Sequence, residues 1–115
     1  MANAEECRAA LEQLSRNLAR STGDVRKAAA LDRSLTCRIT DLDLTFSGRL
    51  RGGRIEDVTE APGPPAAKAE IRLTMSSDDL VALVDGRLNF ASAWATGRVK
   101  LEAGLRDLLR LRTLL

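Results

Sequence analysis

The chain has 115 residues, of which 18 are basic and 16 acidic, so its net charge is +2. A charge this balanced argues against nucleic acid or an anionic surface as the main partner. The aromatic residues, Phe46, Phe90 and Trp94, are too few and too scattered to stack bases. The sequence contains no histidine, which removes the commonest general base and the commonest metal ligand.

The length is typical of one domain, and a composition of 44% apolar and 30% charged residues is that of a soluble globular protein. We therefore expect a single domain spanning residues 1–115. Cys7 and Cys37 lack the spacing of a metal or redox motif, which favours two reduced, buried thiols. The start of the chain does not resemble a signal peptide, and no apolar run reaches the length of a membrane span. The expected location is the cytoplasm.

The first predicted element is a helix. Asn3 and Glu6 have the spacing of a capping box, in which each side chain bonds the backbone of the other residue. Asp24 is placed to cap a second short helix that ends near Leu31. One face of the first helix is apolar, with residues recurring at helical spacing: Cys7, Leu11, Leu14 and Leu18.

From Ser34 the apolar residues alternate with polar ones, which is typical of strands. They occupy odd positions as far as Ile39 and even positions over Leu42–Leu50. Because a change of phase moves the buried face to the other side, we expect a bulge or a tight bend at Thr40–Asp41.

A hairpin and a loop are predicted next. Gly52–Gly53 is a hairpin turn signal, because glycine tolerates the positive φ that such turns need. Residues 55–59 then form the partner strand. Residues 61–67 contain all three prolines of the chain, and they are predicted to form an exposed loop.

Residues 69–75 alternate again and predict another strand. Ser76 is placed to cap the following helix, and Gly86 to end it. Asn89 is placed to cap a short helix over Phe90–Ala95 that stops at Gly97.

The chain is predicted to end with a strand over 99–103 and a helix after Gly104. The apolar residues of that helix share one arc, which we expect to face inward: Leu105, Leu108, Leu109, Leu111 and Leu115. The order of elements predicts an α+β fold with a mostly antiparallel sheet, whose one face is covered by helices.

Two motifs could suggest chemistry. The segment GRLRGGR, Gly48–Arg54, lacks the Lys-Ser/Thr ending of a phosphate-binding loop and joins two strands, so we interpret it as a hairpin tip. The pair Asp78–Asp79 opens a helix, where negative charge is favoured without any catalytic role. With no histidine beside a nucleophile, the sequence does not predict an enzyme.

Phe90 and Trp94 lie among alanines on a short helix, and two interpretations remain open. The rings either fill the core or form part of a cavity wall, since small neighbours leave room beside one large ring.

Four consecutive segments resemble the sterol carrier protein family: AEIRLTM (69–75), SSDDLVALVDGRLN (76–89), AWATG (93–97) and RVKLEAG (98–104). The hairpin over 42–58 agrees with the same pattern. The segment RLNFASAW (87–94) is similar to a subgroup of stand-alone bacterial proteins of this family.

The resemblance implies a five-stranded sheet with an apolar tunnel between sheet and helices. It implies binding, and transfer, of a sterol, a fatty acid, an acyl-CoA or a phospholipid, with no cofactor and with transient membrane contact. The chain would be a monomer or a homodimer. By position, the expected walls are the inward residues of each element: Phe46, Leu73, Met75, Leu80, Leu83, Val84, Leu88, Phe90, Trp94, Leu101, Leu105, Leu108 and Leu109.

An alternative hypothesis keeps the fold and fills its interior. The chain would then be a structural or interaction domain, as a monomer or a homodimer, with no small-molecule ligand. In that case an acidic residue placed at Leu83 or Trp94 would unfold the protein, because an unpaired buried charge costs several kcal/mol.

Overall fold

The computed structural model describes residues 2–20, 32–52 and 54–111. Its helices are α1 (Ala4–Arg20), α3 (Ser77–Val84), α4 (Phe90–Ala95) and α5 (Leu105–Leu111). Its strands are β1 (Arg33–Ile39), β2 (Leu44–Arg51), β3 (Arg54–Pro62), β4 (Ile71–Met75) and β5 (Lys100–Ala103). The helix predicted over 24–31 and the end of the last helix, 112–115, lie outside the described residues.

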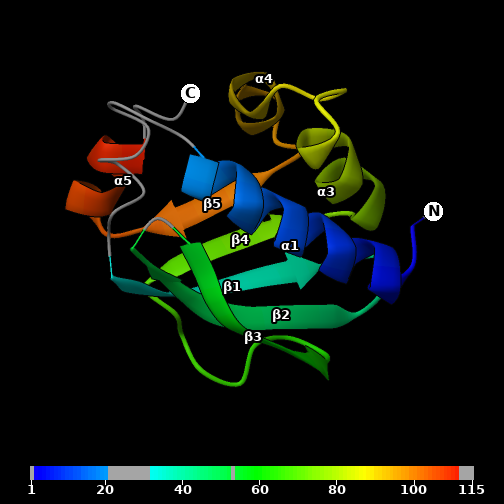
Figure 1. The fold of residues 1–115 in the computed structure, drawn as a ribbon, viewed down its shortest axis with the longest axis horizontal. Coiled ribbons are helices and arrows are strands. Elements are labelled where there is room, and N and C mark those ends of the chain that lie inside the picture. The colour runs from blue at the N-terminus through cyan, green and yellow to red at the C-terminus, as the bar shows by residue number, and fades with distance from the viewer. Residues whose placement is uncertain (1, 21–31, 53, 112–115) are drawn as a thin grey trace.

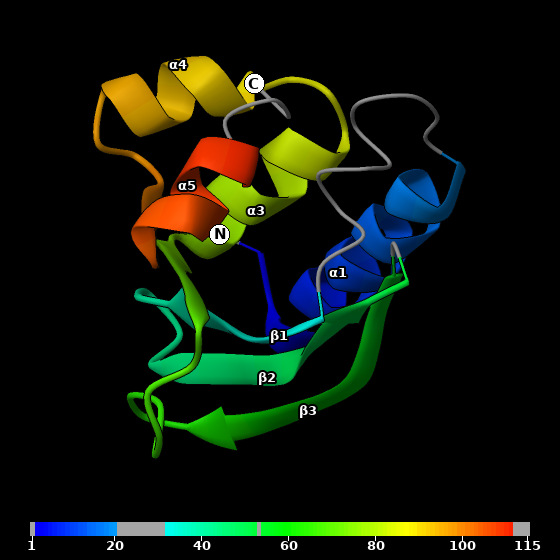
Figure 2. The same ribbon diagram turned by 90° about the vertical axis from the view of Figure 1, so that its left-hand side faces the viewer.

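The strands form one five-stranded sheet in the order β3-β2-β1-β4-β5. Neighbouring strands are antiparallel except for β1 and β4, which are parallel. The helices lie on the same side of this sheet (Figures 1 and 2). The predicted α+β fold with a mostly antiparallel sheet is therefore confirmed.

The bend between the first two strands is where the change of phase predicted it. Residues 40–43 form the turn of the β1–β2 hairpin, and Asp43 has a φ of 49°. Leu42 lies in this turn, so β2 begins two residues later than the apolar pattern indicated. The register then pairs Cys37 with Phe46 and Ile39 with Leu44, which brings both phases to one face.

The second hairpin contains an irregularity at Gly48. The register of β2 against β3 shifts between Ser47 and Arg49, and a Cβ at Gly48 would lie 2.9 Å from the backbone oxygen of Glu56. Only glycine allows the strands to approach so closely here.

β3 extends further than the sequence predicted. Ala61 and Pro62 pair with β2, so the predicted loop over 61–67 is wrong for its first two residues. The physical reason is that β3 is an edge strand, where the missing N–H of a proline faces away from the sheet.

The predicted caps of α1, α3 and α4 are confirmed, whereas the cap predicted at Asp24 lies outside the described residues. The Asn3 side chain accepts from the Glu6 N–H at 2.8 Å, and the Glu6 carboxylate accepts from the Asn3 N–H at 3.2 Å, which completes the capping box. Ser76 Oγ accepts from the backbone of residue 79, and Asn89 Oδ1 accepts from that of residue 92. Gly86 and Gly97 follow the two short helices with φ near 80°.

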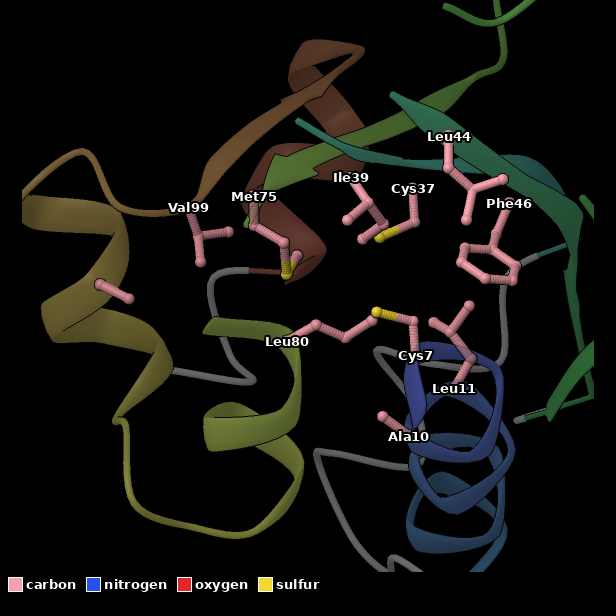
Figure 3. Packing of buried hydrophobic residues seen from close by; sticks show 11 residues of the cluster. Cys7, Ala10, Leu11, Cys37, Ile39, Leu44, Phe46, Met75, Leu80 and Val99 are labelled. Atoms are coloured by element: carbon pink, nitrogen blue, oxygen red, sulfur yellow. The ribbon is translucent and has the colours of Figure 1, made fainter. Parts of the chain in front are cut away.

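The main core lies where α1 and α3 pack on the sheet (Figure 3). Cys7 and Leu11 of α1 and Leu80 of α3 face the strands. The strands contribute the opposing buried side chains: Cys37, Ile39, Leu44, Phe46 and Met75. We refer to this part of the molecule as the packed end.

Candidate functional site

An apolar cavity of about 270 Å³ lies between the sheet and the helices. Its floor is formed by strand residues: Leu35, Cys37, Leu50, Ile55, Ile71, Leu73, Met75 and Leu101. Its roof is formed by residues of α1, α3 and α4 and of the α3–α4 connection: Leu11, Leu14, Leu80, Leu83, Val84, Leu88 and Phe90. Apart from the Cys37 thiol, these side chains have no polar group.

The cavity is set above a second cluster of buried residues, Leu35, Leu50 and Ile71. The apolar side chains packed against this cluster also come from strands: Ile55, Leu73, Leu101 and Ala103. Among the described residues, therefore, no helix contributes a buried side chain to this part of the sheet, although α1, α3 and α4 form the roof of the cavity above it. We refer to this part of the molecule as the hollow end.

The structure brings together most of the predicted wall residues. Eight of them line the cavity: Leu73, Met75, Leu80, Leu83, Val84, Leu88, Phe90 and Leu101. Phe46 is instead buried at the packed end. Trp94 is half-buried and contacts the Phe90 ring, with 6.4 Å between the ring centroids, but it does not itself line the cavity.

α5 is oriented differently from the prediction. Leu105 and Leu109 are 75% and 59% exposed, and Leu108 is half-buried, so none of the three lines the cavity. The residue that points inward is Asp107, which is only 7% exposed. Its carboxylate accepts a hydrogen bond from Arg33 Nε at 2.9 Å, and this ion pair sets the rotation of the helix.

The thiols near the cavity are uncharged at neutral pH. The pKa of Cys37 is raised to about 12 and that of Cys7 to about 11, mainly by burial and to a smaller extent by nearby negative charge. Both cysteines are free and buried, as predicted, and their sulfur atoms point toward one another between α1 and β1 (Figure 3). The cavity wall therefore carries no thiolate nucleophile.

One polar contact positions the helix that forms much of the roof. The Asp41 carboxylate accepts from the Ser77 backbone N–H at 2.8 Å and from the Ser77 hydroxyl at 2.5 Å. Desolvation acts to raise the pKa of Asp41, but the hydrogen bonds from Ser77 outweigh it and leave the pKa below its usual value. The β1–β2 turn thereby holds the first turn of α3 against the sheet.

With this geometry in place, comparison with known proteins decides the family. The model of the SCP-2 sterol transfer family matches residues 11–115. The chain belongs to this family. The family resemblance that the sequence motifs indicated is therefore confirmed, whereas the similarity to a stand-alone bacterial subgroup stays a prediction. No curated protein is significantly similar to this SCP-2 family chain in sequence.

Solved structures share the fold. The sterol carrier protein domain 2 of Helicoverpa armigera is 18% identical, with a TM-score of 0.69 over 98% of this chain and 89% of that one. The ubiquinone synthesis protein UbiJ is 14% identical, with a TM-score of 0.57 over 99% of this chain and 92% of that one. The sec-alkylsulfatase Pisa1 from Pseudomonas sp. is 24% identical, with a TM-score of 0.56, and this chain spans only 15% of its length.

The sequence prediction missed several wall residues of this SCP-2 family chain: Leu11, Leu14, Leu35, Cys37, Leu50, Ile55 and Ile71. The signal that could have found most of them was present, because all except Ile55 lie on an apolar face that the periodicity indicated for their helix or strand. The periodicity does not encode which of the inward residues face a void and which face other side chains.

The described residues offer binding by burial and little else. They contain no group of three His, Cys, Asp or Glu side chains that could hold a metal ion. Among them, none of the helices has the length and apolarity that a membrane crossing requires. What the cavity can do chemically is to remove an apolar molecule from water.

Proposed function

We propose that the chain binds a lipid, such as a fatty acid, an acyl-CoA, a phospholipid or a sterol, with its apolar part in the cavity, and that it transfers this lipid without catalysing a reaction. The observation that supports the proposal is the wall of the cavity, where apolar side chains of the sheet and of three helices surround an unfilled space. Membership of the SCP-2 sterol transfer family supports the same role.

The expected affinity comes from the hydrophobic effect. At roughly 25 cal/mol per Å², burying about 300 Å² of apolar ligand surface is worth about 7 kcal/mol before the cost of ordering the ligand. The volume of about 270 Å³ lies just below the usual range for small-ligand pockets, roughly 300–1,000 Å³. That size favours a slim acyl chain over a rigid fused-ring system.

The composition of the wall also predicts how the ligand is oriented. Because the neutral Cys37 thiol is the only polar side-chain group among the described residues of the wall, a charged head group would lose its hydration without gaining a partner from them. We therefore expect the tail to be buried and the head group to remain in water. Selectivity should depend on the length and width of the tail.

The test is uptake of cis-parinaric acid, a fluorescent fatty acid, by protein purified without detergent. Wild type should bind it with one-to-one stoichiometry. Leu101→Trp adds bulk to the cavity floor and should abolish uptake. Leu109→Trp makes the same change on the exposed surface of α5 and should bind as wild type.

Circular dichroism and urea unfolding establish that both variants are folded before binding is compared. If folded Leu101→Trp takes up the fatty acid as well as wild type does, the cavity is not the binding site. If wild type takes up neither fatty acid nor sterol, and native mass spectrometry finds only the mass of the chain, the interaction-domain hypothesis replaces this proposal.

A further inference from the structure

α5 carries the large apolar side chains that are most exposed in the described part of the chain. Leu105 and Leu109 are four residues apart, so they are neighbours on one face of the helix. Single exposed leucines are ordinary on protein surfaces, but two adjacent ones on a short helix form an apolar patch.

The outward position of these leucines is built into the fold. Asp107 lies between them in sequence and faces inward, where it is held by Arg33 at the start of β1. Arg33 Nε also lies 3.5 Å from the carboxylate of Glu70, which directly precedes β4, so the arginine that holds α5 is itself held from a second side. Turning the leucines inward would break the ion pair between Asp107 and Arg33. Its two charges would then be exposed to solvent or left buried without a partner.

The charge of α5 complements an anionic surface. The sequence of α5 contains two arginines, Arg106 and Arg110, and one aspartate. The aspartate is Asp107, whose charge is already paired with Arg33. Arg106 is exposed beside the leucines, so the outward side combines apolar and basic groups. That combination is typical of helices that lie in the interface of an anionic bilayer.

The position of α5 relates this patch to the cavity. α5 follows β5 directly and packs on it, and β5 contributes Leu101 to the cavity floor. Its partner Arg33 is two residues from Leu35, a member of the hollow-end cluster. α5 therefore stands at the hollow end, at the side of the molecule that faces the viewer in Figure 2.

We propose that the outer face of α5, defined as Leu105, Arg106 and Leu109, docks on the surface of an anionic phospholipid bilayer. The two leucines enter the boundary between head groups and acyl chains, and Arg106 contacts lipid phosphates. Docking in this orientation brings the hollow end toward the membrane. The benefit to lipid transfer rests on the proposed function, whereas the docking itself does not.

The test is co-sedimentation of the full chain with vesicles of phosphatidylcholine, prepared with and without one part in four of phosphatidylserine. Wild type should bind the anionic vesicles. Leu105→Ser/Leu109→Ser should reduce binding by at least about tenfold, because each leucine loses apolar burial. Arg106→Glu should reduce binding to anionic vesicles by at least about fivefold and should hardly affect binding to neutral ones.

A matched control distinguishes an effect of the α5 surface from an effect of the net charge of the chain. Arg87→Glu makes the same charge change as Arg106→Glu, but at an exposed position in the α3–α4 connection. It should bind vesicles nearly as wild type does. Equal losses in the two variants would mean that only the overall charge matters, and would overturn the assignment to α5.

Further outcomes are equally decisive. If wild type does not bind anionic vesicles, or if the double serine variant binds them as wild type does, the proposal is wrong. It is also wrong if sedimentation velocity shows a wild-type dimer that the serine substitutions convert to monomer, because a second copy then covers the patch.

Ligand uptake distinguishes this proposal from the proposed function. In the absence of vesicles the double serine variant should take up cis-parinaric acid as wild type does, and loss of that uptake in a folded variant would assign the leucines to the cavity instead. Vesicle binding by a wild-type chain that takes up no lipid would leave the docking surface standing and refute the cavity.

Discussion

The packed end and the hollow end are built on the same strands, yet among the described residues only the packed end receives buried side chains from helices. β1 contributes Ile39 to the packed end and Leu35 to the hollow end, and β4 contributes Met75 and Ile71 in the same way. At the packed end α1 and α3 meet the sheet with Leu11 and Leu80. The difference therefore arises from what covers the sheet and not from the sheet itself, whose apolar face is continuous.

The largest expected contrast comes from truncating one buried side chain at each end. Phe46→Ala should lower the free energy of unfolding by about 3–5 kcal/mol, because it leaves a void among close-packed neighbours. Leu50→Ala should cost about 2 kcal/mol, at the low end for such a change, since Leu50 already borders the cavity. Urea denaturation measures both values. Equal losses would show that the two ends are packed alike.

Enlarging one buried side chain at each end should also distinguish the packed end from the hollow end, by how much stability the added volume costs. Ile39→Phe has no room at the packed end and should cost about 1–3 kcal/mol. Leu101→Phe extends into the cavity, so the free energy of unfolding should change by less than about 1 kcal/mol. Urea unfolding checks the pair. A large loss for Leu101→Phe would mean that the cavity does not tolerate an added group.

Alkaline pH should weaken the contacts around the two thiols. The pKa of Cys7 is raised to about 11 and that of Cys37 to about 12, so above the usual thiol pKa of about 8.5 the folded state holds protons that the unfolded state releases. Stability should therefore fall as pH rises from about 9 to about 11, by roughly 1 kcal/mol per pH unit for each thiol.

The matched variant for this prediction is Cys7→Ala/Cys37→Ala, measured by urea unfolding across the same pH series. It should be less stable than wild type near neutral pH, but its stability should depend less on alkaline pH. A decline as steep as that of wild type would assign the alkaline effect to other groups.

The smallest effect is expected for the partly buried contact between Asp41 and Ser77 that anchors α3. Because the pKa of Asp41 is lowered in the folded state, its contribution is present above about pH 4, the usual aspartate pKa, and is lost as pH falls below that. Asp41→Asn should destabilise the protein by about 1 kcal/mol near neutral pH and hardly at all in acid. Thermal unfolding at both pH values tests this, and a pH-independent difference would contradict it.

The features that the sequence predicted well are those encoded locally. The capping box of Asn3 and Glu6 and the cap of Ser76 depend on residues three apart, so the pattern is complete within one turn of helix. The alternation in β1, β2 and β4 likewise identifies the inward face from the strand alone. The turn at 40–43 followed from the change of phase between two such runs.

What the sequence did not predict depends on distant partners. The arc of leucines in α5 indicated an inward apolar face, but the rotation of α5 is set by Asp107 and Arg33, which are 74 residues apart. The parallel pairing of β1 with β4 is of the same kind. The cavity wall was found only in part because a void is defined by the arrangement of whole elements, and Leu35 and Ile71 look the same in sequence whether or not a helix covers them.

The net charge of the chain illustrates the same limit. A value of +2 argues against an anionic surface as the main partner. The fold nevertheless neutralises Asp107 internally and leaves Arg106 exposed between two leucines. Attraction to a bilayer depends on this local arrangement, which the total charge does not describe.

The two surfaces of the cavity differ in how readily they can deform. The floor is held by the backbone ladders of β2, β1, β4 and β5, whereas much of the roof consists of the two short helices α3 and α4 and the turn between them. A bound lipid would contact a rigid sheet on one side and more deformable helices on the other. Amide hydrogen exchange should consequently slow around Leu83 and Leu88 when a lipid enters, while the strands keep the protection that they already have. Such a cavity would accept a series of related lipid tails, because the helices of the roof would adjust their positions to each tail.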